Sequence, residues 1–502
     1  MTGNCLSLDL SYPAFRQMTE NLYKPELIPV TVTIPIPEAS PAVLYQHLRT
    51  DKGFLLESME GVPRRAVRSI IGTDIQELFI LDETGNNSDP IGMIRKFMSK
   101  YGLSGKSPAG FAGGLVGYCS YDMVTDLNKG YLDAGKEKNC PVGKFMLARS
   151  GVVLDHQKST CMVFSTPLIH PGDNFSEIYQ KAVKEIQTLA DKIQSAGDEI
   201  PSVGNPSSPA HEIPLTSPLG KEDFESAVRK TLEHIRAGDI FQAVVSRRFQ
   251  TPYTGDPFRL YEEVRLLNPS PYLYFLEFGD ETVIGSSPEM LVKVDGEDIF
   301  TVPIAGTRPR GKDAAEDARL AEEMLADEKE KAEHLMLVDL ARNDIGKVSA
   351  FGSVRVSSFM EVEKFSHVQH MTSQVAGRLA EGLDRFDALG SCFPAGTVSG
   401  APKLRAMQII ADLEPHPRGL YAGAVGYIGF DDRLEFAIAI RTTVVRDGIA
   451  SFQTGAGIVA DSDPTKEYEE TKQKAGAMLA ALSRANAGET GIENQKNEGG
   501  RV

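Results

Sequence analysis

The sequence predicts an α+β fold, with largely antiparallel sheets and with helices grouped against them. Short apolar strands follow one another in the second half of the chain, where two hairpin signals, Asp431-Asp432 and Asp447-Gly448, join them. Longer segments with an apolar residue every three or four positions separate the strand groups and indicate amphipathic helices. Strands joined by tight turns pair antiparallel, so these patterns argue against a regular alternation of one strand with one helix.

The first half of the chain begins with a strand and a helix. Residues 31–38 alternate apolar and polar side chains, which is typical of a strand. Residues 40–48 predict a helix with Ser40 as N-cap and Pro41 at the first helical position. Residues 177–194 predict an amphipathic helix with one apolar stripe. Between the two helices we expect strands at 53–60, 64–72, 77–85 and 111–123, and a hairpin at 145–168.

A stretch rich in Ser, Pro and Gly divides the chain. Residues 195–220 show no helical or strand periodicity and are therefore the best linker candidate. We expect one domain at 1–193, a linker at 194–219 and a second domain at 220–485. Residues 486–502 are polar and rich in Gly, Glu and Asn, so they predict a disordered tail.

The second half of the chain opens on two helices with a strand between them. These elements are expected at 221–239, 241–250 and 256–269. Residues 272–307 predict three strands with polar turns, and residues 319–346 predict one long helix, or two helices with a break. Three further strands are expected at 419–430, 433–446 and 449–455.

Composition excludes several classes of function. The net charge of −16 argues against nucleic acid as a partner, because binding to phosphates needs a positive surface. No apolar run is long enough to cross a membrane, and the first residues lack a signal-peptide pattern. The five cysteines are scattered and contain no CxxC pair, so they predict neither a disulfide framework nor a zinc site. We expect a cytoplasmic protein with reduced thiols.

The loop at 394–403, PAGTVSGAPK, brings together features of a ligand site. Gly396 and Gly400 lack a Cβ, so a ligand could approach the backbone there, and Thr397 adds a hydroxyl. Small-residue turns of this kind are also common as purely structural elements. A guanidinium at Arg441, the glycine-rich turn 455–457 and a pair of glutamates follow within about 75 residues, a combination that suits a carboxylate substrate held with a metal.

Two pairs of glutamates have the spacing of a shared helix face. Glu330 and Glu333 lie three residues apart, and Glu467 and Glu470 repeat this spacing on a second predicted helix, which Asp463 caps. Two such pairs could hold a hard cation such as Mg²⁺. Neighbouring lysines offer the alternative of solvated surface ion pairs. Arg441 interrupts an apolar strand, where it either binds a ligand or pairs with an internal acid.

The order of the motifs resembles the chorismate-utilising enzymes and, within them, most closely the large subunit (component I) of anthranilate synthase. The resemblance is strong over residues 219–482 and weak before them. The motifs are GDIFQAVVSRRF, NPSPYLYF, SSPEM, PIAGTRPRG, DEKEKAEHLMLVDLARND, HMTS, PAGTVSGAPK, YAGAVGY, AIRT, TGAGIV and DPTKEYEETKQKA. The resemblance implies sheets packed as a sandwich with helices outside, a regulatory N-terminal domain and a chorismate-binding catalytic domain.

The resemblance also implies a role for each matching residue. Glu333 and Glu470 would bind Mg²⁺, with Glu330 and Glu467 in support. His370 would be the base in pyruvate elimination, and Glu289 would be the general acid for loss of the C4 hydroxyl, beside which Thr397 would position the ring. The residues expected to contact the substrate are Gly306, Thr307, Tyr421, Arg441, Gly455, Ala456, Gly457 and Lys474.

Two positions select the reaction within the resembled family. Gln242 stands where the water-activating isochorismate synthases carry a lysine, and a neutral amide cannot serve as that base. Ala305 stands where enzymes of the para-aminobenzoate pathway carry a lysine nucleophile. Both differences point to attack by ammonia at the ortho position. The alternatives are the large subunit of aminodeoxychorismate synthase and a non-catalytic regulatory subunit that binds tryptophan.

The resemblance implies a feedback site and a partner subunit. Glu57 and Ser58, together with Pro271-Tyr272-Leu273, match a tryptophan inhibitor site, although packing between two strands would explain these residues equally well. Cys119 and Cys392 lack the context of a glutaminase nucleophile. We therefore expect a separate glutamine amidotransferase subunit that supplies ammonia, in a heterotetramer of two large and two small subunits.

Overall fold

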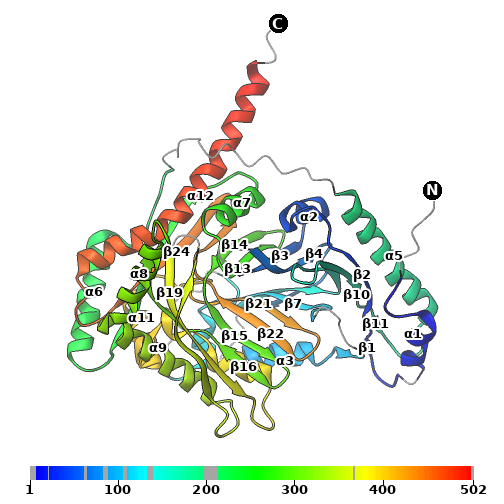
Figure 1. Ribbon diagram of the computed structural model, residues 1–502, viewed down its shortest axis with the longest axis horizontal. Helices are drawn as coiled ribbons and strands as arrows, with labels where there is room; N and C mark the ends of the chain where they lie inside the picture. The colour runs from blue at the N-terminus through cyan, green and yellow to red at the C-terminus, as the bar shows by residue number, and fades with distance from the viewer. Residues whose placement is uncertain are drawn as a thin grey trace.

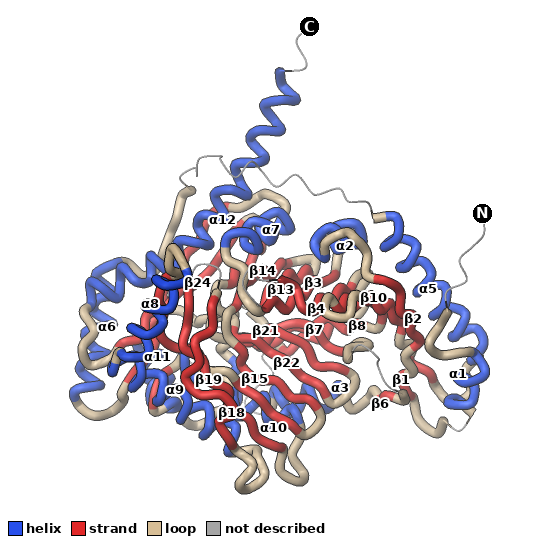
Figure 2. Tube along the Cα trace, viewed as in Figure 1, coloured by secondary structure: helices blue, strands red, loops and turns tan. Residues whose placement is uncertain are grey.

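The computed structural model describes residues 7–20, 22–60, 65–82, 89–105, 110–132, 140–196, 213–365 and 368–498 of the chain. It has two large sheets and a small one, with helices packed outside them (Figures 1 and 2). Apart from one parallel pair in the small sheet, the strands named in the three sheets pair antiparallel. The predicted α+β class is therefore confirmed.

The first large sheet has eleven strands that come from both halves of the chain. In spatial order they are β2 (Val30–Pro35), β10 (Thr160–Ser165), β9 (Ser150–Asp155), β4 (Arg65–Gly72), β3 (Gly53–Glu60), β13 (Tyr272–Glu277), β14 (Glu281–Ser287), β23 (Thr442–Arg446), β24 (Ile449–Ile458), β12 (Gln242–Pro252) and β20 (Gly400–Ala401).

The second large sheet has ten strands. In spatial order they are β17 (Ile304–Pro309), β19 (Val368–Arg378), β16 (Asp298–Thr301), β15 (Met290–Asp295), β22 (Arg433–Ile438), β21 (Ala424–Gly429), β7 (Gly114–Cys119), β8 (Gly143–Ala148) and β5 (Leu78–Leu81), with β18 (Arg355–Lys364) beside β19. The small sheet consists of β11 (Leu168–Ile169), β1 (Glu26–Leu27) and β6 (Gly102–Leu103).

The helices cover the outer faces of the two sheets. They are α1 (Tyr12–Thr19), α2 (Pro41–Leu48), α3 (Pro90–Met98), α4 (Met123–Leu127), α5 (Phe175–Ser195), α6 (Lys221–Arg236), α7 (Pro257–Leu267), α8 (Ala314–Ala326), α9 (Glu328–Gly346), α10 (Arg385–Cys392), the 3₁₀ turn η1 (Gly396–Val398), α11 (Lys403–Leu413) and α12 (Pro464–Glu498). Among the described residues, no helix is both long and apolar enough to span a membrane.

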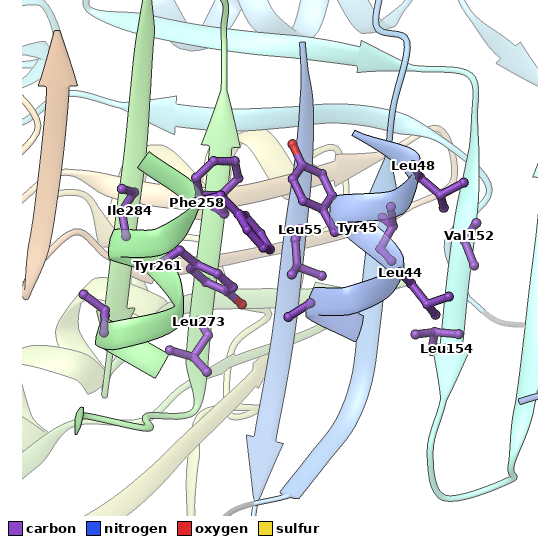
Figure 3. Close-up of a cluster of buried hydrophobic side chains, with 14 of the residues drawn as sticks. Leu44, Tyr45, Leu48, Leu55, Val152, Leu154, Phe258, Tyr261, Leu273 and Ile284 are labelled. Atoms are coloured by element: carbon purple, nitrogen blue, oxygen red, sulfur yellow. The ribbon is translucent and has the colours of Figure 1, made fainter. Parts of the chain in front are cut away.

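Three apolar clusters make the layers. Phe54 and Tyr274 of the first sheet meet Val116 and Val425 of the second in one buried cluster, so the sheets pack face to face. A second cluster joins the outer face of the first sheet to α2, α5, α7 and α12, and Figure 3 shows Tyr45 and Phe258 in it. A third joins the second sheet to α3, α9 and α10. The predicted sandwich with outer helices is present, and it fixes which strand ends lie together.

Several local signals fold as expected. The Ser40 hydroxyl accepts a hydrogen bond from the Val43 amide at the start of α2. Residues 319–346 form two helices, because the Asp327 carboxylate accepts bonds from the amides of Lys329 and Glu330 and starts α9 anew. Asp463 accepts bonds from the first amides of α12 in the same way.

The predicted domain boundary does not separate two sheets. In the first sheet β3 pairs with β13, and in the second β7 pairs with β21, so both sheets cross residues 194–219. Strand pairing is set by tertiary packing, which a local change of composition does not reveal. Residues 197–212 of the predicted linker lie outside the described residues. Where a disordered tail was predicted from 486, the backbone of α12 continues as helix to Glu498, an extension of a helix already begun.

Residues 433–446 do not form one strand, as their apolar pattern predicted. β22 ends at Ile438 in the second sheet, and β23 begins at Thr442 in the first. Arg441 lies between them with a φ of 50°, in the left-handed region that side chains rarely adopt. The chain therefore crosses from one sheet to the other at Arg441.

Candidate active site

A cavity of about 410 Å³ lies at this crossing. Seven of the predicted site residues line it: Glu289, Thr397, Tyr421, Arg441, Gly455, Gly457 and Lys474. They come from β24, from η1, from α12 and from segments that flank strands of both sheets, so only the folded chain brings them together. The cavity combines a few polar and charged side chains with apolar walls, which is the usual composition of a small-molecule site.

Arg441 gives this cavity its main positive charge. Its Nη1 atom lies 3.5 Å from the Asn268 side-chain oxygen, and among the described residues it forms no salt bridge. Burial lowers the pKa of Arg441, while the charge of Glu289 acts in the opposite direction. A partly buried guanidinium that no carboxylate neutralises is suited to binding an anionic ligand. The alternative that Arg441 makes an internal ion pair finds no support in these contacts.

Glu289 has the protonation state of an acid catalyst. It follows the end of β14 and is only 7% exposed. Burial raises the pKa of Glu289 to about 8, against the lowering effects of the Thr397 hydroxyl, the Ile304 backbone and Arg441. A carboxyl with this pKa carries its proton at neutral pH and can donate it to a leaving group.

The opposite wall is backbone that needs glycine. A Cβ on Gly455 would lie 2.6 Å from the Tyr421 hydroxyl, and one on Gly457 would lie 2.8 Å from the side-chain nitrogen of Gln242. Two polar groups thus reach close to the strand only because both positions lack a side chain. Gln242 is 4% exposed at the start of β12. The Ala456 side chain lies in a buried apolar cluster with Phe224, so only its backbone is available to a ligand.

The two glutamate pairs lie on α9 and α12, and Glu470 of the second pair is close enough to Glu333 of the first for their charges to interact. Burial raises the pKa of Glu333, and the negative charges of Glu330 and Glu470 raise it further. Burial also raises the pKa of Glu467, which shares a hydrogen bond with Glu470. Neighbouring carboxylates that raise the pKa of Glu333 and of Glu467 lie close enough for a cation to relieve the repulsion. The chemistry of this donor set therefore fits Mg²⁺.

Lys474 connects these carboxylates with the cavity. Its Nζ atom lies 2.7 Å from Glu470 Oε1 and donates a bond of 3.0 Å to the Gly455 carbonyl oxygen. In the part of the chain that the structure describes, no three His, Cys, Asp or Glu side chains converge as a preformed metal site. The metal assignment therefore stays a prediction.

His370 is held in a defined tautomer beside Gly306 and Thr307. Its Nδ1 atom lies 2.8 Å from the Gly306 carbonyl oxygen and 3.1 Å from the Thr307 hydroxyl. A carbonyl oxygen only accepts, so the neutral ring carries its proton on Nδ1 and its lone pair on Nε2. His370 does not line the cavity itself, but it lies on the same face of β19 as Val368, which does. Gly306 adopts a φ of 64°, and a Cβ there would lie 3.3 Å from Glu330.

Ala305 and the remaining predicted residues lie near the cavity rather than in its wall. Ala305 pairs with Met371 on β19, next to His370. Gln242 lies close to the lining residue Gly457, and Glu470 pairs with the lining residue Lys474, while Gly306 and Thr307 contact His370. Sequence reasoning missed Asn268, Thr442 and Gln453, which line the cavity. Asn268 begins the NPSPYLYF motif, but its contact with Arg441 depends on tertiary packing and leaves no local signal in the sequence.

The predicted inhibitor residues come together on two paired strands. Ser58 of β3 lies opposite Tyr272 of β13, and Glu57 lies opposite Leu273. The Pro271 carbonyl oxygen accepts a bond from the next residue of β3, the Met59 amide. The strand pairing thus places these residues side by side.

The Glu57 carboxylate already has protein partners. The Tyr261 hydroxyl donates to it at 2.9 Å and Arg265 at 3.0 Å, while the Tyr272 hydroxyl donates to Glu435 at 3.1 Å. The bonds from Tyr261 and Arg265 hold the buried Glu57 side chain on β3, an interior strand of the first sheet, which is compatible with either of the two interpretations of the sequence.

Comparison with known proteins identifies the family. The model of the chorismate binding enzymes matches residues 53–480. Anthranilate synthase component 1 of Aquifex aeolicus is 41% identical over 495 residues, which covers 95% of this chain and 98% of that protein. The protein of the same name from Streptomyces coelicolor is 46% identical over 443 residues, which covers 87% of this chain and 85% of that one.

Solved structures agree with these sequence matches. Anthranilate synthase component I from Streptococcus pneumoniae TIGR4 superposes with a TM-score of 0.69 at 37% identity, covering 84% of this chain and 93% of that one. A menaquinone-specific isochorismate synthase from Escherichia coli has the same TM-score at 19% identity, covering 94% and 98%, and shares the fold. The chain is a member of the chorismate binding enzymes.

Proposed function

We propose that this protein is the chorismate-converting component of an anthranilate synthase, which forms anthranilate and pyruvate from chorismate and ammonia in tryptophan biosynthesis. The family, and relatives named anthranilate synthase component 1 over nearly the whole chain, support this proposal. The observation that carries it is the cavity in which Arg441, a guanidinium with no salt-bridge partner among the described residues, faces a protonated carboxyl, Glu289.

The substrate is a dianion, and the site offers cations to both of its carboxylates. Arg441 is suited to grip the enolpyruvyl carboxylate, with the Tyr421 hydroxyl and the backbone of Gly455 beside it. Glu333 and Glu470, supported by Glu330 and Glu467, would hold Mg²⁺. When bound, this ion supplies positive charge that neutralises the ring carboxylate. Lys474 adds a further cation between these two regions.

The first step is an exchange of groups on the ring. Ammonia forms a bond to C2, and the hydroxyl on C4 departs with the proton of Glu289 as water. Glu289 suits this role because burial keeps its carboxyl protonated at neutral pH. Thr397, whose hydroxyl lies beside the Glu289 carboxyl, helps to position this part of the ring. The proton that the new ammonium group loses balances the one that Glu289 gives up.

The second step restores aromaticity. His370 removes the proton from C2, the ring carbon–oxygen bond to the enolpyruvyl group breaks, and that group leaves as pyruvate after taking up a proton. The Gly306 carbonyl oxygen holds the imidazole with its lone pair on Nε2, as a base requires. Anthranilate is the product.

Two neutral side chains, Gln242 and Ala305, favour ammonia as the nucleophile. Gln242 reaches toward Gly457 with an amide, which cannot activate water as a lysine does. Ala305 offers no amine for covalent capture of the ring. Ammonia needs neither aid, because it is already nucleophilic. The competing function, the large subunit of aminodeoxychorismate synthase, is therefore disfavoured.

A product assay tests the proposal. Purified protein with chorismate, Mg²⁺ and an ammonium salt at pH 8 should develop anthranilate fluorescence and an equal amount of pyruvate. A product with the amino group in the para position would instead support the aminodeoxychorismate alternative. Absence of any turnover would support a non-catalytic regulatory subunit.

We further propose that glutamine-derived ammonia comes from an amidotransferase subunit, in an assembly of two large and two small chains. The name component 1, carried by the relatives, implies a second component. Burial raises the pKa of the thiols of Cys119 and Cys392 to about 12, so neither is poised to act as a glutaminase nucleophile. The test is glutamine-dependent activity, which should appear only after a glutaminase subunit is added.

Tryptophan is the proposed inhibitor at the paired strands β3 and β13. Ser58 and Glu57 lie opposite Tyr272 and Leu273 there, and Pro271 precedes them. Tryptophan should inhibit the ammonia-dependent reaction of the native chain, and Ser58→Ala should require at least about tenfold more tryptophan for the same inhibition. Equal inhibition of both proteins would remove Ser58 from the inhibitor site.

A further inference from the structure

A buried ion pair lies directly behind the wall of the proposed chorismate cavity. Arg418 Nη2 and Glu414 Oε1 are 2.7 Å apart, and their side chains are 1% and 5% exposed. Both residues follow the end of α11 and precede Tyr421. Neither lines the cavity of about 410 Å³, but both border a second cavity of about 530 Å³ on their other side.

The donors of Arg418 are used to hold parts of the cavity wall. Its Nη1 donates to the Val398 carbonyl oxygen at 2.8 Å, next to Thr397, and its Nη2 donates to the Val244 carbonyl oxygen at 2.6 Å. Its Nε donates to Glu414 at 2.8 Å. Val398 and Val244 both line the cavity. One planar guanidinium thus fixes the spacing between η1 and β12.

The same guanidinium also supports Tyr421. Its carbon lies 5.6 Å from the centre of the Tyr421 ring and 4.6 Å from that of Tyr121. Tyr421 lines the cavity with its hydroxyl close to Gly455. Cation–ring contacts of this length are attractive and depend on the orientation of the ring. A shift of Arg418 would therefore release the tyrosine from its place at the substrate.

Glu414 extends the network to the neighbouring strands. Its Oε1 accepts bonds from the backbone amide and the hydroxyl of Ser246 at 2.9 and 2.7 Å. The Ser246 hydroxyl in turn accepts a bond of 2.7 Å from the side chain of Gln453, which lines the cavity. Through one carboxylate, β12 and β24 are tied to the same arginine.

Stability alone is a weak reason for this arrangement. Burying two charges has a large desolvation cost, and apolar residues of similar volume often stabilise a core as well or better. A buried pair does offer directional bonds, and here they end on four parts of one cavity: η1, β12, β24 and Tyr421.

We propose that Arg418 and Glu414 are positioning residues for the reaction of chorismate. They hold Tyr421 and the Thr397 turn at the distances that the bound substrate requires. This inference rests on the proposed function, because it concerns binding and turnover in the same cavity. A purely structural role would instead affect the folded state as a whole and leave the use of substrate unchanged.

The conservative variant Arg418→Lys separates these roles. Lysine keeps the charge and can reach Glu414, but it lacks the planar fork that binds two carbonyl oxygens. In the ammonia assay we expect kcat/KM for chorismate to fall at least about tenfold, since small displacements of binding groups have large effects on rate. The KM for ammonia should change less than about twofold.

Lys144→Met is the matched control. Lys144 is 2% exposed and pairs with Glu281 at 3.1 Å, but it lines none of the substrate cavity. It should lower the melting temperature by at least as much as Arg418→Lys while leaving kcat/KM for chorismate within about twofold. An equal loss of kcat/KM in both variants would overturn the proposal.

A double-mutant cycle tests whether Arg418 acts through Tyr421. The double variant Arg418→Lys with Tyr421→Phe should have a kcat/KM no more than about twofold below that of the less active single variant. Both changes disturb the same contact, so their effects should not multiply. Fully multiplicative effects would contradict a shared role.

If Arg418→Lys fails to fold, Glu414→Gln takes its place in both experiments, because glutamine keeps the shape of the side chain and one acceptor oxygen. Turnover by the native chain tests the proposed function separately, so the two hypotheses can fail independently.

Discussion

At the scale of single residues, Glu289 links burial to chemistry most clearly. Burial raises the pKa of Glu289 to about 8, so the carboxyl is protonated when the protein works near neutral pH. A general acid must begin the reaction with its proton, and activity that depends on it is lost when the group ionises.

We therefore predict that kcat falls as the pH rises through about 8, and that Glu289→Gln lowers kcat by about 10²- to 10⁴-fold. The pH–rate profile of the native chain and the single-pH rate of the variant measure these effects. Loss of activity that begins only above pH 10 would contradict this role for Glu289.

The Glu289 carboxyl should also make the free energy of unfolding depend on pH. The folded pKa of Glu289 is raised above the unfolded value of 4.5, so its contribution to folding is fully present below pH 4.5 and is lost as the pH rises through about 8. Glu289→Gln removes this dependence. The melting temperature of the variant, measured relative to that of the native chain, should therefore rise between pH 5 and pH 9. If the difference between the two melting temperatures is the same at every pH, the pKa of Glu289 is not raised.

His370 tests the second step of the reaction. His370→Ala should slow release of pyruvate by about 10²- to 10⁴-fold. Amination of the ring, which does not need this base, should continue, so an aminated intermediate that still carries the enolpyruvyl group should accumulate and be visible by mass spectrometry. Unchanged turnover would remove His370 from its assigned role.

Residue types predicted the site better than they predicted its local conformation. Arg441 was singled out because a charge within an apolar strand needs a partner. That same apolar pattern concealed the break at Arg441, since alternation continues through the crossing between the two sheets. Asn268 was missed because its contact with Arg441 arises only from tertiary packing.

At the scale of elements, the proposed Mg²⁺ site depends on the relative placement of α9 and α12. The three-residue spacing on each helix was enough to predict that each pair of glutamates shares a face. It could not predict that Glu470 lies near Glu333, because that depends on how the two helices pack against separate sheets. The negative charge of Glu470, which contributes to the raised pKa of Glu333, indicates this proximity.

Glu333→Gln and Glu470→Gln should each raise the Mg²⁺ concentration for half-maximal activity by at least about tenfold. Glu469→Gln is the control, because Glu469 lies on the same helix but pairs with Lys472 at 3.1 Å. Its Mg²⁺ requirement should stay within about twofold of that of the native chain. The same Mg²⁺ dependence in all four proteins would show that the cation binds elsewhere.

At the scale of the whole molecule, the two halves of the chain build both large sheets together. β3 pairs with β13 and β7 with β21, so neither half completes a sheet by itself. Apolar periodicity identified most of these strands, but it contains no information about partners more than 200 residues apart. The sequence therefore suggested two separate domains, whereas in the structure strands from both halves of the chain share each large sheet.

Shared sheets predict cooperative unfolding. We expect one calorimetric transition for residues 1–485, with equal calorimetric and van't Hoff enthalpies, because separating the halves would expose strand edges in both sheets. Two resolved transitions, with the first 193 residues melting alone, would instead support independent domains.

We propose that one cavity between the two sheets directs ammonia to the ortho carbon of chorismate. The most direct measurement supplies ¹⁵N-ammonium, Mg²⁺ and chorismate to the native chain and locates the label by NMR. We expect one ¹⁵N atom on the carbon next to the carboxyl-bearing carbon, with one pyruvate released for each label incorporated. Label at the para carbon, or pyruvate released without incorporation of nitrogen, would contradict this proposal.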